Sequence, residues 1–567
     1  MADARRQGWA MRHSSDIPMS GQDARAGAVD RRFPAWAGLL ALGLCGAALV
    51  FFATPYGAGL GGDSYYYVSG ARNLLAGLGF SRPAADGGIR LITHYPSGYS
   101  LALAAMTGIG LDTLVAARWL SSALFGTNIF LIGFLVYRAS RSVIPALGAA
   151  LLALGSPALI VVHTWVLSEP LFLTFTLLFL IGLSVCAERG RAGDIAGAGL
   201  ATALAYLTRY VGFVLIASGV SALLVFGAGD FKRRLVRAAG YGAISALGPI
   251  VWAVRNLAVS GSVAYSAQQL HPPSLDRLVE AGNTVSLWLL PSRVPFEIRL
   301  IAAGVAIALL IVAGARLFGP GAGETRRRAE SAHIGVLACL IVFYPLTLVG
   351  ALTLVGGSIP LDDRILSPLL VASIALAVLI AWSAYRQAGK SRVWRVGIAL
   401  VALGFAAMTV VRAAGTVQRL HADGQGTAAR AWRDSELVDW VRRLPEGVTL
   451  YSNELDVIYL YTGRQAFQVP IRWDPVLEAP RDDYAAQLSA MRDRLANQAA
   501  VLVLFDTIAA QSAFLPPREE LTDGLLVVFQ TSDGAAYSAS PSARLTQGRA
   551  VVRIPTALDA LGRGILE

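Results

Sequence analysis

The feature that most constrains this chain is a series of long apolar runs separated by short polar stretches. The runs lie at 34–54, 113–137, 143–162, 171–187, 194–209, 211–228, 236–259, 298–318, 332–355, 365–385 and 393–412. A run of roughly 17–25 apolar residues is long enough to cross a bilayer as a helix. None shows the residue-by-residue alternation that is typical of membrane β-barrels. The sequence therefore predicts a polytopic α-helical membrane protein with about eleven transmembrane helices.

Composition excludes the main soluble alternatives. Charged residues make up only 15% of the 567 residues, whereas soluble domains carry roughly 25%. A soluble protein of this length could not cover its surface with so little charge, which argues against a cytoplasmic enzyme, a disordered protein or a nucleic-acid binder. The net charge of +11 is then best explained by basic loops on the cytoplasmic side. Membrane lipids, and no nucleic acid, are the expected surroundings.

The basic residues also predict the orientation of the chain. They cluster in the tail at 1–33 and between alternate spans, at 138–141, 189–191, 232–237, 316–328 and 386–392. The apolar segment 98–110 decides on which side these clusters lie. At about 13 residues it is too short to span comfortably, and counting it as a span would separate the later clusters from the tail. We therefore expect it to lie in the outer interface, with every basic cluster inside.

This topology divides the chain into three parts. Residues 1–33 form a cytoplasmic basic tail, and 34–412 form the transmembrane domain, whose first outer loop is 55–112. Residues 413–567 form an extracytoplasmic α/β domain, with helices at 436–444 and 482–497 and buried strands at 448–451 and 500–505. A hairpin over 525–538 completes it, because Ser532, Asp533 and Gly534 give a turn signal.

Polar residues gather on the predicted outer side, and Asp63 in the first outer loop is the principal candidate. It follows Gly61 and Gly62 and precedes a predicted helix over 64–75. A carboxylate at a partly desolvated helix start is suited to act as a general base. Asp is also a favoured N-cap, so capping of that helix is an equally weighted alternative, and one side chain can do both.

Glu169 is the second acidic candidate, and it starts the span at 171–187 beside Pro170. Stabilisation of the helix dipole would explain it without any function. As a functional residue it could orient Asp63, accept a sugar hydroxyl or help to hold a metal. His94 and His163 could complete a divalent-cation site, but their spacing matches no ligand motif. We therefore predict no metal site and no required cofactor, with a divalent cation as the alternative.

Arg209, Arg255 and Arg364 lie at or near the outer ends of spans. Guanidinium groups suit phosphate oxygens, although any single one could simply extend to the membrane interface. We interpret the three together as a binding site for a donor phosphate. Asp362 is expected in a solvated loop. The candidates for substrate binding are Tyr66, His94, Tyr95, His163 and Asp363.

These motifs, in this order, resemble those of the GT-C superfamily of integral-membrane glycosyltransferases, which includes the protein mannosyltransferases and the bacterial aminoarabinose lipid A transferases. The matching stretches are Gly-Asp-Ser-Tyr-Tyr at 62–66, Tyr-Pro-Ser-Gly-Tyr at 95–99, Leu-Ser-Glu-Pro-Leu-Phe at 167–172, Leu-Thr-Arg-Tyr at 207–210, Trp-Ala-Val-Arg-Asn at 252–256, Asp-Arg-Ile-Leu-Ser-Pro at 363–368, and two stretches of the tail, 451–453 and 461–464.

The resemblance implies a fold, a reaction and a location. It implies a hexosyl- or pentosyltransferase that moves a sugar from a polyprenyl phosphate to a lipid or glycan acceptor of the cell envelope, with inversion, at the outer face of a bacterial plasma membrane. Asp63 would be the general base, with Glu169 beside it as a second catalytic residue. The three arginines would stabilise the leaving phosphate.

Two other functions are kept as alternatives. A transporter or flippase for lipid-linked sugars should show inverted repeats and polar residues near the middle of the bilayer, whereas the polar groups here gather at one face. A scaffold that recruits cell-envelope partners through the tail domain would need no catalytic residues.

Overall fold

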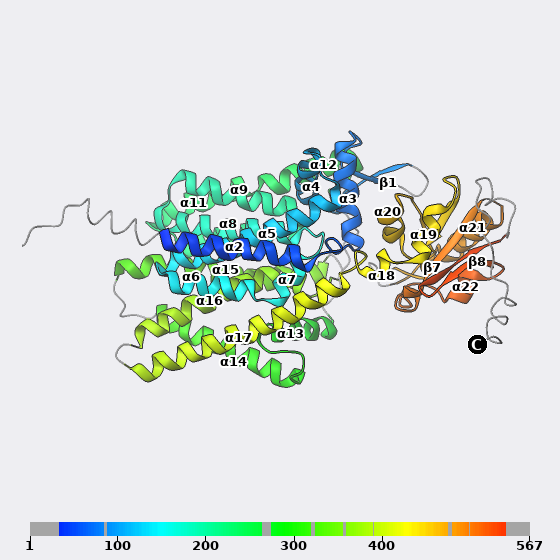
Figure 1. Cartoon of the computed structure of the whole chain (residues 1–567). Helices are drawn as coiled ribbons and strands as arrows, with labels where there is room; N and C mark the ends of the chain where they lie inside the picture. Colours follow the sequence, from blue (N-terminus) through cyan, green and yellow to red (C-terminus); the bar gives the residue numbers. More distant parts are fainter. Residues whose placement is uncertain are drawn as a thin grey trace, which may run out of the picture.

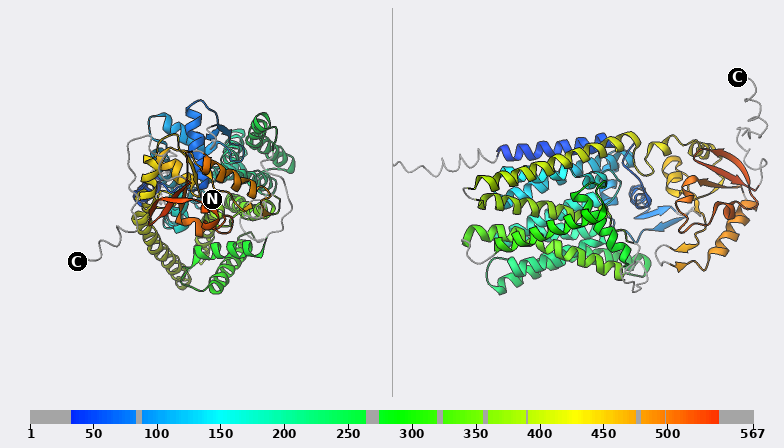
Figure 2. Two further views of the ribbon diagram at one scale, coloured as in Figure 1. Left: turned by 90° about the vertical axis from the view of Figure 1, so that its right-hand side faces the viewer. Right: turned by 90° about the horizontal axis from the view of Figure 1, so that it is seen from below.

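The computed structural model describes residues 33–83, 88–263, 274–318, 324–354, 359–388, 391–474, 479–497 and 499–539. The basic tail expected at 1–33 lies outside these residues, apart from Phe33. The described chain forms a long helical bundle with a smaller sheet-containing domain stacked on one end, as Figure 1 and the right-hand view of Figure 2 show.

Each of the eleven apolar runs coincides with a helix or a broken pair of helices. They are α2 (Phe33–Ala53), α5 (Thr113–Ser140), α6 (Val143–Leu154) with α7 (Pro157–His163), α8 (Glu169–Arg189), α9 (Ala192–Thr208), α10 (Phe213–Phe226), α11 (Phe231–Ser245) with α12 (Leu247–Ser260), α14 (Phe296–Phe318), α15 (Glu324–Leu354), α16 (Asp363–Gln387) and α17 (Arg392–Asp423).

Among the described residues, eight helices are long and apolar enough to cross a membrane, with α11 and α12 counted together. The α6–α7 pair, bent by 62°, gives a ninth. The two remaining runs form α9 and the segment Tyr210–Phe226, each 17 residues long and therefore at the lower limit for a span. The prediction of a polytopic helical membrane protein is confirmed, although fewer than eleven helices have full spanning length.

Small residues let the helices pack closely. A Cβ built on Gly43 of α2 would lie 2.8 Å from the carbonyl oxygen of Gly126 on α5, so a larger residue would push these two helices apart. Helices in a bilayer gain most of their association energy from close packing of this kind.

The end of the bundle that faces the sheet domain carries several short elements (Figure 1). These are α3 (Gly62–Leu75), β1 (Ser81–Pro83), β2 (Ile89–Leu91), α4 (Gly98–Gly108) and α13 (Leu275–Leu289). Helix α4 covers the ambiguous apolar segment. Its 11 residues reach only about 16 Å at 1.5 Å per residue, so it does not span.

The C-terminal domain is built on a five-stranded sheet in the order β4-β3-β7-β9-β8. Its strands are β3 (Thr449–Ser452), β4 (Phe467–Gln468), β7 (Ala500–Phe505), β8 (Leu526–Thr531) and β9 (Gly534–Ser538). Strands β3, β4 and β7 run parallel, and the β8–β9 hairpin adds antiparallel strands. Helices α19 (Glu436–Arg443), α20 (Leu455–Thr462) and α21 (Tyr484–Asn497) pack with it. Strands and helices lie close to their predicted places.

The helical bundle and the C-terminal domain share more contacts than the sequence predicted. Helix α17 continues past the expected boundary at 412 as far as Asp423. The change from apolar to polar residues at 412 therefore does not end the helix. The segment that follows pairs with the first loop through a bridge between Leu60 and Gly426. Helix α20 then contacts α3, so the domain is held against the same short elements.

Candidate active site

Asp63 is positioned by the way the chain enters α3. Gly61 is the N-cap of this helix, and its backbone N–H donates to Ser64 Oγ at 3.0 Å. The Ser64 hydroxyl in turn donates to the Val166 carbonyl at 2.9 Å. Asp63 is therefore the second residue of the helix and not its cap, which leaves its carboxylate available for other partners.

The two carboxylate oxygens of Asp63 have different partners. Arg364 donates from a guanidinium nitrogen to Oδ2 at 2.6 Å, and the Tyr95 hydroxyl donates to Oδ1 at 2.6 Å. The side chain is 30% exposed. Burial opposes the charge of Asp63, but Arg364 and Tyr95 outweigh it, so the pKa of this carboxyl lies below its usual range. Asp63 is consequently an ionised group near solvent.

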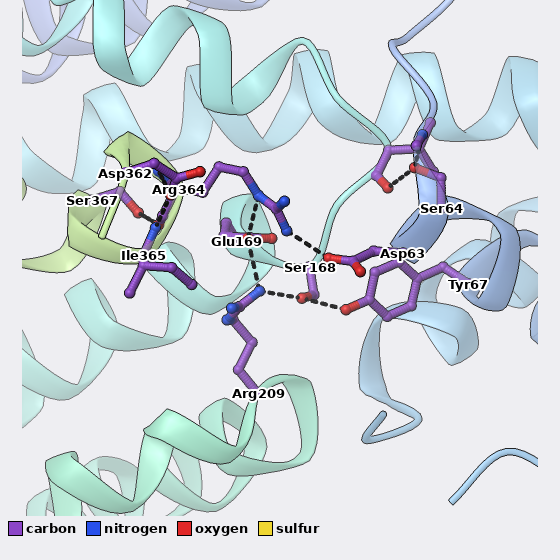
Figure 3. Close-up of polar contacts among 12 residues, drawn as sticks. Asp63, Ser64, Tyr67, Ser168, Glu169, Arg209, Asp362, Arg364, Ile365 and Ser367 are labelled. Carbon is purple, nitrogen blue, oxygen red and sulfur yellow. Dashed lines mark hydrogen bonds and ion pairs between the residues drawn. The ribbon is translucent and has the colours of Figure 1, made fainter. Parts of the chain in front are cut away.

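Glu169 lies beside Asp63 and holds two arginines in place (Figure 3). Its Oε1 accepts from Arg209 at 2.8 Å and from Arg364 at 3.0 Å. Only 2% of the side chain is exposed. Its Oε2 is buried and has no hydrogen-bond partner among the described residues. We call the four residues Asp63, Glu169, Arg209 and Arg364 the ion cluster.

A short parallel pairing aligns the two acids. The Gly59 N–H donates to the Thr164 carbonyl at 2.7 Å, and the Val166 N–H donates to the Gly59 carbonyl at 2.8 Å. This bridge sets Gly59 against Trp165, and each acid follows four residues later. A second contact joins the same segments, because the Tyr67 hydroxyl lies 2.9 Å from Ser168 Oγ, which also accepts from Arg209 at 3.1 Å.

The cluster balances two carboxylates against two guanidiniums. Arg364 and Arg209 keep 30% and 19% of their side chains exposed, whereas Glu169 is closed off. Both guanidinium groups are therefore partly accessible to an anion. Guanidinium forks bind phosphate oxygens well, so the arrangement can hold a phosphate next to a carboxylate base.

Further predicted residues surround Asp63. The Tyr66 ring packs 5.1 Å from the Tyr95 ring, and His94 meets Tyr66 edge-on at 4.4 Å, both measured between ring centroids. Burial and the nearby Arg82 guanidinium lower the pKa of His94 to about 4, so its ring is neutral at pH 7. Tyr66, His94 and Tyr95 thus border the ion cluster.

Arg255 does not join the cluster that the sequence predicted for it. Its guanidinium donates to the Ile92 carbonyl at 2.5 Å and to the Phe80 carbonyl at 3.2 Å. These carbonyls lie at the two ends of the β1–β2 hairpin. The loop that contains the hairpin folds back over α12, so its backbone carbonyls come within reach of Arg255. Arg255 therefore fixes the hairpin to α12.

Asp363 and Asp362 also differ from expectation. Asp363 accepts from the Trp288 indole N–H at 2.8 Å and so ties α16 to α13, a helix that the sequence analysis did not identify. Asp362 does not lie free in a solvated loop. It is the N-cap of α16, where it accepts from the backbone of Arg364 and Ile365. The cap fixes the start of the helix that carries Arg364.

His163, a predicted substrate-binding residue, lies in the core of the bundle. It is 1% exposed, its Nδ1 lies 2.7 Å from the Leu159 carbonyl, and its Nε2 lies 2.9 Å from the Asn128 amide nitrogen. The same amide donates to the Pro170 carbonyl at 3.0 Å, so His163 supports the start of α8 indirectly. In the parts of the chain that the structure describes, no three His, Cys, Asp or Glu residues are placed to share a metal ion.

Three residues near the site were not predicted from the sequence. Tyr67 lies in a run of three tyrosines, of which only Tyr66 was singled out, although a helical spacing from Asp63 could have selected it. Arg82 lies on β1, and Tyr459 of α20 packs on Tyr65 with ring centroids 5.2 Å apart. Their proximity depends on loop and domain folding that local patterns do not reveal.

Comparisons with known proteins place this geometry in a known architecture. No protein-family model and no curated protein matches the sequence. Among solved structures, ArnT from Cupriavidus metallidurans bound to undecaprenyl phosphate is similar, with a TM-score of 0.56 and 14% identity over 89% of this chain and 98% of that one. The chain has the GT-C fold.

Two other GT-C structures match with lower TM-scores. The archaeal oligosaccharyltransferase AglB from Archaeoglobus fulgidus, in complex with an inhibitory peptide and a dolichol-phosphate, gives 0.49 with 12% identity over 83% of this chain and 70% of that one. The mycobacterial arabinofuranosyltransferase AftD gives 0.47 with 15% identity over 88% and 41%. In this chain, the ion cluster lies at the end of the GT-C bundle that carries the C-terminal domain.

Proposed function

We propose that the chain is a glycosyltransferase that moves a hexose or pentose from a polyprenyl phosphate to a lipid or glycan acceptor of the cell envelope, with inversion. The observation that carries the proposal is the ion cluster itself. A partly exposed carboxylate lies against a partly exposed arginine, at one end of a bundle with the GT-C fold. The reaction would take place at the extracytoplasmic face of a bacterial plasma membrane.

In this mechanism Asp63 acts as the general base. It takes the proton of the acceptor hydroxyl while the hydroxyl oxygen bonds to the anomeric carbon of the donor sugar. The bond from that carbon to the phosphate oxygen breaks, and the phosphate leaves with the electron pair. Attack from the face opposite the leaving group inverts the anomeric centre. Arg364 and Arg209 stabilise the negative charge that grows on the phosphate.

The ion cluster also explains how the base becomes competent. A carboxylate with a depressed pKa is a weak base, and Arg364 is a main cause of that depression. A donor phosphate that binds Arg364 competes with Asp63 for the guanidinium. The affinity of Asp63 for a proton then rises at the moment when an acceptor is to be deprotonated. Glu169 keeps Arg364 in place during this exchange.

The test is replacement of Asp63 by Asn, which keeps the size of the side chain and removes the base. We expect transfer to fall by about 10²–10⁴-fold, while binding of undecaprenyl phosphate persists. The readout is mass spectrometry of envelope glycans from a deletion strain that carries each variant. Asp112→Asn is the matched control, because Asp112 caps α5 in the same loop and Asn caps equally well.

Full transfer by a correctly inserted Asp63→Asn protein would reject the catalytic role. It would instead favour a transporter or flippase of lipid-linked sugars, which needs no general base. Loss of transfer in both Asp63→Asn and Asp112→Asn would point to a folding defect. In that case binding of undecaprenyl phosphate would be lost as well.

A further inference from the structure

A second group of cationic and aromatic residues lies next to the ion cluster, on the β1–β2 hairpin and α3. The Arg82 guanidinium carbon lies 5.4 Å from the centre of the Tyr66 ring. The guanidinium also donates a long hydrogen bond of 3.4 Å to the neighbouring Pro83 carbonyl. Within the described residues Arg82 forms no ion pair with a carboxylate, although it is half-buried. Guanidinium groups form strong charge-assisted hydrogen bonds with anions, so a half-buried arginine of this kind suits an anionic ligand group.

The register of the hairpin adds a second positive charge. Arg82 on β1 pairs directly with Arg90 on β2, and like charges at directly opposed positions destabilise a strand pair. Arg90 is exposed. Two arginines at opposed positions of a two-stranded hairpin form a favourable setting for an anionic group, which would relieve their repulsion.

The hairpin is held rigidly in this position. Arg255 binds the carbonyls at both of its ends, Phe80 and Ile92. The Tyr65 hydroxyl donates to the Pro83 carbonyl at 3.1 Å and so holds β1 against α3. Tyr459 of the C-terminal domain packs against the other side of Tyr65. The backbone on both sides of the hairpin is therefore fixed, so a ligand would have to order only the side chains.

These residues connect to the base through a short aromatic chain. Arg82 lies over Tyr66, Tyr66 packs on Tyr95, and Tyr95 donates to Asp63 Oδ1. His94 packs edge-on against Tyr66 and is neutral, so it can donate to or accept from a sugar hydroxyl. Aromatic faces beside polar groups suit the apolar patches and hydroxyls of a sugar ring.

We infer that Arg82, Arg90, Tyr66 and His94 form a subsite for the acceptor, and that this acceptor is an acidic saccharide carrying a carboxylate or phosphate group. The inference rests on the proposed function, because it assigns the acceptor side of the same reaction. The aromatic chain would place a sugar hydroxyl near Asp63 while the arginines hold the acid group.

The two oxygens of Asp63 separate this subsite from the donor phosphate. Oδ2 faces Arg364, which Glu169 holds together with Arg209, whereas Oδ1 faces Tyr95 and the aromatic chain. An inverting displacement needs the acceptor and the leaving phosphate on different sides of the anomeric carbon. The aromatic chain and the ion cluster contact different oxygens of Asp63, which is consistent with this requirement.

The test measures equilibrium binding to the full-length protein in lipid nanodiscs at low salt. The probes are methyl glucuronide, glucose 6-phosphate and, as the neutral reference, methyl glucoside. We expect at least one of the acidic sugars to bind about tenfold more tightly than the neutral one. Whichever acidic sugar is preferred identifies the anion as a carboxylate or a phosphate.

The variants locate the preference. Arg82→Gln should reduce it to within about twofold, and Arg90→Gln should weaken it, whereas Arg82→Lys should retain part of it. Arg443→Gln removes a charge from α19 that is exposed, as Arg90 is, and it should leave the preference for acidic sugars unchanged. Undecaprenyl phosphate binding is measured on every variant. It should survive Arg82→Gln and be lost in Arg364→Gln, and its survival also shows that a variant is folded.

Each outcome has a defined meaning. If the native protein binds undecaprenyl phosphate but binds all three sugars equally, the acidic acceptor is wrong while the proposed function stands. If Arg82→Gln abolishes undecaprenyl phosphate binding in a protein whose thermal stability is unchanged, Arg82 belongs to the donor site and the acceptor subsite is wrong. If the native protein does not bind undecaprenyl phosphate, the proposed function itself is wrong.

Discussion

At the scale of single residues, the burial of Glu169 makes it the main support of the ion cluster. Its removal would leave Arg209 and Arg364 without their shared counter-ion. We expect Glu169→Ala to cost about 3–5 kcal/mol of stability, because breaking a buried pair leaves an uncompensated charge. Asp434→Ala, which breaks an exposed pair with Arg430, should cost about 1 kcal/mol or less. Thermal unfolding in detergent compares the two, and equal shifts would contradict this role.

Tyr95 should control the acid limb of the pH profile. The general base must be ionised, and the pKa of Asp63 is depressed, so kcat/KM should hold until the pH falls below the usual range of Asp. Tyr95→Phe removes a hydrogen bond to the ionised form, which raises the pKa of Asp63 and moves the loss of activity to higher pH. Tyr99→Phe is the control, because Tyr99 is buried against Tyr67 and does not bind Asp63. An unmoved acid limb in Tyr95→Phe would contradict this assignment.

The outcome for single residues follows from where each lies relative to a helix end. Asp63, Glu169, Arg209 and Arg364 were predictable because each lies at the end of a helix or within its first turn, and span topology brings those ends together. Arg255 and His163 met the same criterion in sequence but bind backbone acceptors or core amides instead. No local sequence pattern distinguishes an arginine that binds loop carbonyls, such as Arg255, from one that pairs with a carboxylate, such as Arg364.

At the scale of elements, the bridge between Leu60 and Gly426 joins the C-terminal domain to the loop before α3. We expect this Leu60–Gly426 bridge to set the position of Asp63. Gly426 lies in the left-handed region with φ +57°, and a Cβ on it would lie 2.2 Å from the Leu60 carbonyl oxygen and 2.4 Å from the Trp165 ring. Gly426→Ala should therefore displace the segment that precedes Asp63. A misplacement of this kind should lower the transfer rate by on the order of tenfold or more.

Gly463 provides the matched control for that change. It also has a positive φ, +71°, but nothing lies within 4 Å of its Cβ position. Gly463→Ala carries the same backbone strain without the clash, so it should lower thermal stability and leave the transfer rate per folded molecule unchanged. Equal losses of transfer rate in the two variants would mean that backbone strain, and not displacement of the Leu60–Gly426 bridge, lowers the rate.

Helices and strands differed in how well the sequence anticipated them. Apolar runs and β-patterned segments were placed to within a few residues, because burial in lipid or in a sheet core dictates their composition. Helix α13 was missed because it is short and amphipathic, with polar residues along its length. The extension of α17 to Asp423 was missed because a helix can continue into water after its apolar run ends.

At the scale of the whole molecule, the distribution of basic residues predicts on which side of the membrane the ion cluster lies. Arg189, Arg191 and Arg386 lie at the ends of α8, α9 and α16, whose opposite ends carry Glu169, Arg209 and Arg364. The excess of Lys and Arg in short loops marks the cytoplasmic side. The ion cluster, α3, α4 and the C-terminal domain would then share the extracytoplasmic side, where a lipid-linked donor could meet an envelope acceptor.

Single cysteines test this orientation directly. Cys45, Cys186 and Cys339 are first replaced, and Ser512→Cys or Lys232→Cys is then introduced. Both positions are exposed. Lys232 belongs to α11 and Ser512 to the C-terminal domain, and these two parts lie at opposite ends of the molecule (Figure 1). A membrane-impermeant thiol reagent should label the cysteine at 512 on intact cells, and the one at 232 only after the membrane is opened. Labelling in the reverse order would place the base in the cytoplasm. Envelope acceptors could then no longer be its substrates.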